Sequence, residues 1–314
     1  MVLKTTLSKW SLMLAFCLSV LSISSSAEKV TYQGNWNSPG ISLQKQNAQG
    51  VTIGFSVKEF DIDTRSFNGE MMQELNLTGN FLPNGEGAPN LPVISRYIAV
   101  PQGAQAVVEI KRQRTESIAN ISLAPSPRIP LDTERGPLQY NKDLSIYSKN
   151  AYYPQQPVIL SQPSKIRGVD VVLVSITPYQ YNPITKELVV IRDLEVNVSF
   201  VGGNGHFGED RLRSRFWDPI LRDNILNSES LQPIDYSARM AYQTRNRETG
   251  CEYLIIVPND AVFSQWADTI KKFRTEQGIL TEVVTLAEIG GNTTTQIENY
   301  INNAYNTWSI PPAA

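Results

Sequence analysis

Cysteine and histidine are the scarcest of the residues in this sequence that could do chemistry. Its 314 residues contain two cysteines, Cys17 and Cys251, and one histidine, His206. A thiolate nucleophile needs a neighbouring base or positive charge to lower its pKa, so a cysteine hydrolase would have to pair Cys251 with His206. His206 lies in the part of the sequence with a strand-like pattern, whereas Cys251 lies where the β-α-β-α pattern begins. We therefore expect Cys251 to lie at the start of a strand without a catalytic role. The same scarcity excludes zinc sites built from four cysteine and histidine ligands.

Two further motifs are explained by local structure. Asp260 follows a predicted strand, where ligands often bind in parallel sheets, but it is also placed to cap the next helix, and capping is the simpler interpretation. Residues 202–208 are rich in glycine. No Lys-Ser or Lys-Thr pair follows them, so they predict a turn rather than a phosphate-binding loop. These residues therefore predict no catalytic residue, metal ligand or cofactor site in this chain.

The first 27 residues have the pattern of an export signal. Two lysines precede an apolar run over 10–21, and small residues lead to Ala27, after which we expect cleavage. The apolar run is too short for a stable transmembrane span. A lipoprotein signal at Cys17 is the alternative, but a bulky residue precedes this cysteine and the apolar run continues after it. We expect a secreted or cell-surface protein that has no membrane association after signal removal.

Residues 28–245 have the pattern of an antiparallel, sandwich-like β domain. Short runs rich in Val, Ile and Tyr alternate with Pro, Gly and Asn turns, which is typical of a sandwich or barrel. Residues 182–186 predict a hairpin connection. The predicted strands are 51–57, 93–100, 106–111, 169–177 and 188–200. The whole chain has 28 Lys and Arg against 30 Asp and Glu, and this balance argues against a nucleic-acid partner.

Less regular segments lie among and after these strands. Prolines are frequent in 112–165, which predicts long loops or edge segments, and such loops are either binding elements or connections without a role. Short helical turns are expected in 207–237. Four hydrophobic residues there are expected to cover one side of the sandwich: Phe216, Ile220, Ile225 and Leu226. The polar segment 238–250 is interpreted as an exposed linker.

The pattern changes after residue 250. A strand at 253–257 precedes an amphipathic helix that ends at Gly278, and a strand at 281–286 precedes a helix at 293–305. This β-α-β-α series is the beginning of a parallel α/β sheet. The apolar positions of the first helix are Phe263, Trp266, Ile270 and Phe273. Two strands rarely form a stable sheet of this kind, so 246–314 predict the N-terminal part of a truncated α/β domain. A small extension packed on the sandwich is the alternative.

Several stretches of the chain resemble gingipain-type cysteine endopeptidase precursors. The propeptide signature of that family is similar to GAPNLPV at 87–93, followed by YIAVPQG at 97–103. It is also similar to Tyr153-Pro154, followed by Arg167-Gly168 and by PYQYNP at 178–183. Residues 253–286 resemble the start of the peptidase domain of these precursors. Together these stretches extend the resemblance over nearly all of 30–310.

The resemblance implies a β propeptide followed by a caspase-like α/β catalytic domain. Such a propeptide binds the peptidase domain of its own chain, restrains it, helps it to fold and is then cut off. The mature enzyme would act on protein substrates. The family's catalytic His and Cys have no counterpart in 1–314, so we expect this chain alone to be inactive, and calcium is an expectation for the full-length parent only. The alternative is a non-enzymatic prodomain that inhibits or chaperones a separate cysteine peptidase.

Four arginines are candidates for the control of such a peptidase. Arg245 and Arg247 lie in the predicted linker, and we expect processing after one of them because an extended, exposed segment can enter a protease cleft. The alternative is a solvated basic linker that is never cut. Arg128 and Arg135 lie in the proline-rich segment and are inhibitory-loop candidates for a cleft that accepts a basic side chain. The alternative is that both are ordinary exposed charges.

Overall fold

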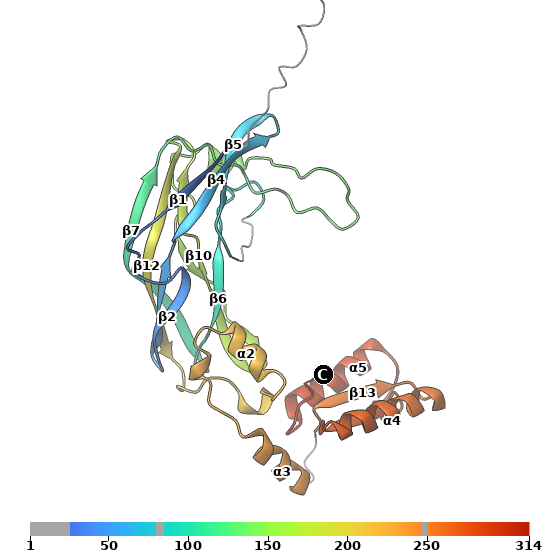
Figure 1. Ribbon diagram of the computed structural model, residues 1–314. Helices are drawn as coiled ribbons and strands as arrows, with labels where there is room; N and C mark the ends of the chain where they lie inside the picture. The colour runs from blue at the N-terminus through green and yellow to red at the C-terminus, as the bar shows by residue number, and fades with distance from the viewer. Residues whose placement is uncertain (1–25, 80–84, 247–249, 314) are drawn as a thin grey trace, which may run out of the picture.

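The computed structural model describes residues 26–79, 85–246 and 250–313, and within them three antiparallel sheets form a β domain that precedes a small α/β unit (Figure 1). The first sheet contains β2 (Gly40–Asn47), β3 (Gly50–Ser56), β7 (Ala104–Ile118), β11 (Tyr179–Asn182) and β12 (Glu187–Gly202). The second contains β6 (Ile94–Ala99), β8 (Val158–Leu160), β9 (Ser164–Ile166) and β10 (Val169–Ile176). The third contains β1 (Ser26–Thr31), β4 (Glu59–Phe67) and β5 (Glu70–Asn76).

The strands β12 and β10 organise the two larger sheets. β12 pairs with β7 along one side and with β3 and β11 along the other. The hairpin expected at 182–186 is confirmed, because Asn182 pairs with Glu187 and the Asn182 side chain accepts the backbone N–H of Ile184. β10 pairs with β6 on one side and with β8 and β9 on the other, as its continuous apolar run at 171–174 predicts for a central strand.

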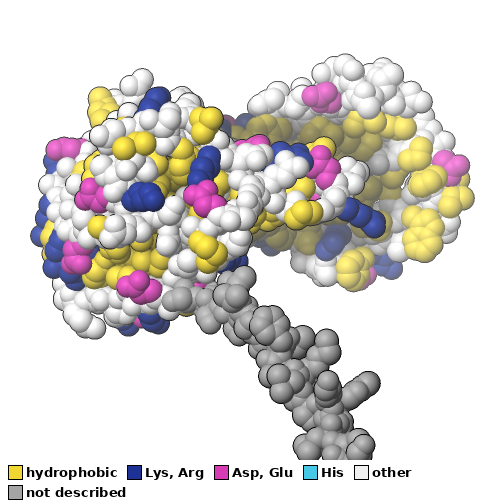
Figure 2. All heavy atoms as spheres, turned by 90° about the horizontal axis from the view of Figure 1, so that it is seen from above, with side chains coloured by type: hydrophobic (Ala, Val, Ile, Leu, Met, Phe, Trp, Pro, Cys, Tyr) yellow, Lys and Arg dark blue, Asp and Glu magenta, His cyan; other side chains and the backbone are white. Residues whose placement is uncertain are grey.

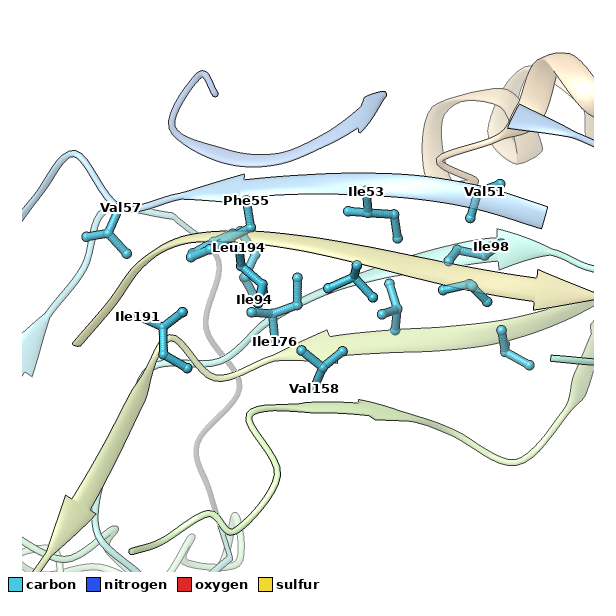
Figure 3. Close-up of a cluster of buried hydrophobic side chains, with 14 of the residues drawn as sticks. Val51, Ile53, Phe55, Val57, Ile94, Ile98, Val158, Ile176, Ile191 and Leu194 are labelled. Atoms are coloured by element: carbon cyan, nitrogen blue, oxygen red, sulfur yellow. The ribbon is translucent and has the colours of Figure 1, made fainter. Parts of the chain in front are cut away.

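The hydrophobic core lies between the two larger sheets (Figure 3). Side chains from four strands meet there and are almost completely buried: Ile53, Phe55, Ile98, Ile176 and Leu194. Burying each such side chain contributes about 1.5–3 kcal/mol. All buried members of this core lie between Tyr32 and Leu231. The β domain therefore has a core of its own, independent of the α/β unit, and is expected to fold alone.

Two buried tyrosines on β11 test how much the hydrogen bonds of a buried hydroxyl contribute to the stability of the β domain. The Tyr179 hydroxyl has no hydrogen-bond partner among the described residues, whereas the Tyr181 hydroxyl donates to Ile121 O and accepts from Leu123 N. Tyr179→Phe should leave the free energy of unfolding unchanged or raise it, because no hydrogen bond is lost. Tyr181→Phe should lower it by about 1–3 kcal/mol, because two buried backbone groups lose their partner. Urea unfolding measures both, and equal losses would contradict the structure.

One short helix, α1 (Leu144–Tyr147), lies between β7 and β8, and the others follow β12 in the sequence. Their bounds are η1 (Asp210–Leu212), α2 (Asp218–Asn224), η2 (Ser228–Ser230) and α3 (Tyr236–Asn246). The expected cover of the sandwich is correct for Ile225 and Leu226, which pack on the β-domain core. It is wrong for Phe216 and Ile220, which are exposed. Leu221 is buried instead, because successive helical residues point about 100° apart and α2 turns this position toward the core.

The segment interpreted as a linker is helical over most of its length. α3 extends through Asn246, so the extended conformation expected for 238–250 is wrong up to that residue. Residues 236–246 contain neither proline nor glycine, and the Asp235 carboxylate accepts the backbone N–H of Ala238, as an N-cap does. Residues 247–249, and with them Arg247, lie outside the described residues.

The α/β unit contains β13 (Tyr253–Val257), α4 (Ala261–Glu276), β14 (Thr281–Thr285) and α5 (Thr294–Thr307). β13 and β14 are parallel, as predicted, and a parallel bridge between Gly250 and Ile310 lies on the other side of β13. The bridge requires glycine, since a Cβ on Gly250 would lie 2.5 Å from the Ile310 carbonyl oxygen. Residues 310–313 thus begin a third parallel segment beside β13.

The amphipathic helix α4 does not bury its apolar face within the described residues. Phe263, Trp266 and Phe273 are 56%, 66% and 56% exposed, and Ala267 is the buried residue of the helix. The physical reason is the small width of the sheet. Two paired strands and one bridge are wide enough to cover only the side of α4 on which Ala267 lies. Hydrophobic side chains are visible on the surfaces of both the α/β unit and the β domain in Figure 2.

Candidate functional site

Arg128 and Arg135 lie in one long loop that projects from the β domain (Figure 1). At its base the backbone N–H of Arg128 donates to the carbonyl of Gln139 at 3.1 Å. Further along, the N–H of Glu134 donates to Leu131 O at 2.9 Å, which closes a turn. Three hydrophobic side chains of the loop are exposed: Ile129, Leu131 and Leu138. The loop therefore presents apolar and cationic groups to solvent on a defined backbone.

The two arginines differ in what they contact. The Arg128 guanidinium donates to the Glu134 carboxylate, with Nη2 and Oε2 2.6 Å apart, and this pair holds the two sides of the loop together. Arg135 is exposed, and no partner of its guanidinium is found in the described part of the chain. The structure thus leaves Arg135 available to another molecule and uses Arg128 within the loop.

The processing candidates fall at the two ends of the β domain. Ala27 lies in β1, opposite Asp63 of β4, and residues 1–25 lie outside the described residues. Arg245 lies in the last turn of α3, next to the end of that helix at Asn246. A protease binds its substrate in an extended conformation, so cleavage after Arg245 requires this last turn to unwind.

Cys251 and His206 do not form a catalytic pair. Cys251 is completely buried, and burial is the main cause that raises the pKa of its thiol to about 12, so the thiolate is scarce at neutral pH. His206 pairs instead with Asp210, with Nε2 and Oδ1 3.2 Å apart. Asp260 caps α4, because its carboxylate accepts the N–H groups of Val262 and Phe263. Among the described residues no group of three or more His, Cys, Asp or Glu side chains could hold a metal ion.

The contacts between the β domain and the α/β unit come from residues for which the sequence predicts no role, although Arg167 lies in the stretch that resembles the propeptide signature. Arginines from the β domain and from the segment after it reach backbone or carboxylate oxygens of the unit: Arg167, Arg211, Arg215 and Arg239. Arg211, Arg213 and Arg215 alternate in the sequence, and this local signal could have pointed to Arg211 and Arg215, although Arg213 pairs with Asp218 instead. Alternation alone does not reveal the partner.

Two family matches cover the chain, the first on the β domain and the second on the α/β unit. Residues 31–234 match the family Propeptide_C25, and residues 246–314 match Peptidase family C25. The class of protein is therefore a peptidase propeptide joined to residues of its peptidase domain. The chain belongs to the C25 family of propeptides and peptidases, and the resemblance to gingipain-type precursors is confirmed.

The curated relatives are gingipains of Porphyromonas gingivalis. Gingipain R1 is 28% identical over 196 residues, which are 61% of this chain and 19% of that protein. Gingipain R2 of strain W83 is 24% identical over 227 residues, which are 70% of this chain and 29% of that protein. Lys-gingipain HG66 is 29% identical over 160 residues, which are 48% of this chain and 9% of that protein. The chain thus spans less than a third of the length of these relatives.

A solved structure shows the same fold. The complex of Porphyromonas gingivalis RgpB pro- and mature domains matches with a TM-score of 0.55 and 22% identity, and it covers 62% of this chain and all of the matched chain. The mainly β architecture of the propeptide part is therefore that of a known peptidase prodomain. No helix in the described residues is long and apolar enough to span a membrane.

Proposed function

We propose that the protein is a secreted, gingipain-like cysteine endopeptidase zymogen, in which residues 28–245 restrain and help to fold the peptidase domain that begins at residue 246. The observation that supports this most directly is the order of the two family matches, 31–234 and then 246–314, in one chain. Export would use residues 1–27, with cleavage after Ala27. The mature enzyme would cleave proteins.

Catalysis is assigned to residues other than those of this chain. The only histidine pairs with Asp210 and the thiol of Cys251 is buried, so neither is placed to attack a peptide bond. We therefore propose that residues 1–314 alone lack peptidase activity. Calcium is proposed for the full-length parent only.

Restraint is proposed to act through the loop that carries Arg135. An exposed cation on a projecting loop can occupy a cleft that accepts a basic side chain. Pro130 and Pro137 limit the conformations of the loop, and the pair between Arg128 and Glu134 closes it, so less entropy is lost on binding. The direct test is the inhibition constant of residues 28–246 against the peptidase domain of the same precursor. A failure to inhibit at micromolar concentration would refute the proposal.

Maturation is proposed to cut the chain after Arg245 or Arg247. Replacing both arginines with alanine in the full precursor should leave it unprocessed, because a cleft selective for a basic side chain loses its anchor. The single variants should show which bond is cut, and we expect Arg247→Ala to have the larger effect, since the bond after Arg245 lies in α3. Mass spectrometry of the secreted products measures the outcome. Arg222→Ala serves as the control, and normal maturation of the double variant would contradict the assignment.

A further inference from the structure

The loop that carries Arg135 also exposes the peptide bond that follows this residue. Residues 129–139 are all exposed, and the loop projects from the β domain (Figure 1). Exposed loop tips are preferred sites of proteolytic cleavage. A cleft that accepts the Arg135 side chain is therefore also placed to cut the bond between Arg135 and Gly136, and an inhibitor that is cut there is consumed. A loop that inhibits must keep this bond out of the conformation that a protease cuts.

The residues before Arg135 form a closed turn. The backbone N–H of Glu134 donates to Leu131 O at 2.9 Å, and the Glu134 carboxylate accepts the backbone N–H of Leu131, with N and Oε2 3.3 Å apart. Both backbone hydrogen-bonding groups of Leu131 are thus bound to a single residue. A protease binds the residues before the scissile bond in an extended conformation and pairs with their backbone groups. The turn must therefore open before the chain can bind as a substrate.

A second contact fixes the glutamate that closes the turn. Arg128 donates from Nη2 to Glu134 Oε2 at 2.6 Å and from Nη1 to Glu134 Oε1 at 3.4 Å. The backbone N–H of Arg128 donates to Gln139 O at 3.1 Å, so the guanidinium reaches the turn from the base of the loop. The hydrogen bonds from Arg128 and Leu131 lower the pKa of Glu134, so its carboxylate is charged at neutral pH. The turn is thus tied to the base of the loop by a charged pair.

The chain also leaves the extended path directly after Arg135. Gly136 has a φ of +146°, a conformation that residues with a side chain rarely adopt. Pro137 follows, and its ring restricts the backbone at the next position. The bond between Arg135 and Gly136 is therefore flanked by a closed turn on one side and by a bend that favours glycine on the other.

We propose that Arg128 and Glu134 form a clamp that holds the bond between Arg135 and Gly136 in a folded conformation that a protease does not cut, so that the loop presents the Arg135 cation without being consumed as a substrate. The inference rests on the proposed function, because only a loop that enters a peptidase cleft needs this protection. Arg128 and Glu134 then act as positioning residues, and Arg135 is the residue that enters the cleft. Loss of the clamp should shorten inhibition in time more than it weakens inhibition at the start.

The test uses trypsin, an unrelated protease that accepts a basic side chain. Residues 28–314 are digested at low trypsin concentration, and fragments that end at Arg135 are counted by mass spectrometry. A synthetic peptide of residues 126–140 gives the rate for the same sequence without the β domain. We expect the parent to be cut after Arg135 at least about tenfold more slowly than the peptide, because the rate follows the population in which the turn is open.

Two variants remove the clamp to different extents. Arg128→Ala should raise the rate of cleavage after Arg135 about threefold to fivefold, because an exposed ion pair is lost and the turn keeps its backbone hydrogen bond. Glu134→Ala should raise it about tenfold or more, because the hydrogen bond from Leu131 is lost as well. The same changes in the peptide correct for the sequence preference of trypsin. Melting of each chain before digestion checks that the β domain is folded.

Asp132→Ala is the matched control. Asp132 is exposed in the same turn, and the described residues contain no partner for its carboxylate, so this variant should be as resistant as the parent. Cleavage of the parent as fast as the peptide, or a Glu134→Ala variant as resistant as Asp132→Ala, would overturn the clamp.

The cognate peptidase domain separates the clamp from inhibition itself. Inhibition by residues 28–246 should persist in the parent, whereas inhibition by Glu134→Ala should decay as the product cut after Arg135 accumulates. Decay at the same rate in both proteins would contradict the clamp. A parent that does not inhibit at all would refute the proposed function instead, and the trypsin rates would still decide whether the clamp protects the bond.

Discussion

Replacing Arg135 with alanine should weaken inhibition of the cognate peptidase domain by residues 28–246 about a hundredfold, which corresponds to the loss of one interface hot spot. The side chain is exposed in the prodomain and has no partner there among the described residues. Its removal therefore costs the prodomain no stability, and the whole effect should appear in binding. A fluorogenic peptide assay with increasing prodomain concentration gives the inhibition constant.

Arg128→Ala distinguishes the two arginines of the loop. Its ion pair with Glu134 is exposed, and exposed pairs contribute little to stability, so inhibition should weaken by less than about fivefold. Arg96→Ala on β6 removes an exposed arginine from another part of the β domain and should have no effect. A double variant of Arg128 and Arg135 that inhibits as well as the parent would remove the loop from the mechanism.

Replacing Asp193 with alanine should lower the free energy of unfolding of the β domain by about 3–5 kcal/mol, the range for breaking a buried charge pair. Asp193 lies on β12 and is completely buried. The strand register places Ser56 of β3 and Arg114 of β7 directly opposite. The carboxylate accepts from Ser56 Oγ at 2.6 Å, from Arg114 Nε at 2.7 Å and from the backbone of Trp36. Urea unfolding of residues 28–246 measures the loss, and Asp223→Ala, at an exposed position, is the control.

The same residue should make the β domain sensitive to acid. Burial acts to raise the pKa of Asp193, but hydrogen bonds from Ser56, Trp36 and Arg114 outweigh it and hold the pKa below its ordinary value. A carboxyl with a lowered pKa in the folded state stabilises the fold above its unfolded pKa of about 3.9, and this contribution is lost as the pH falls below that value. The stability of the parent should therefore fall more steeply between pH 5 and pH 3 (about one unit on either side of 3.9) than that of Asp193→Asn. Equal slopes would contradict the assignment.

Local features of the fold could be predicted from the sequence because neighbouring residues encode them. The continuous apolar run in β10, the turn at Asn182 and the cap at Asp260 each depend on residues within a few positions, and all three are confirmed. The segment 238–250 was missed because its polar composition suits a linker and an exposed helix equally. The cap from Asp235 and the contacts of Arg239 decide in favour of the helix.

The candidate site could be predicted only as a set of positions. The sequence placed Arg128 and Arg135 in one loop but could not rank them, since the pair between Arg128 and Glu134 appears only when the loop closes. Phe216 and Ile220 are predicted to cover one side of the sandwich because their hydrophobic character is visible in the sequence, but the tertiary structure sets the direction of each side chain and exposes both.

By itself the sequence determined the two-part organisation, an antiparallel β domain followed by the beginning of a parallel α/β unit, and its resemblance to a peptidase precursor. Hydrophobic periodicity and turn residues depend only on neighbouring positions in the sequence, so they can be recognised before the packing of the chain is known. The tertiary structure alone decided which arginine of the loop is available, and it alone brought Arg215 to Glu252 across 37 positions of sequence. Contacts of this kind depend on how separately folded parts pack, and no local pattern of residues specifies that packing.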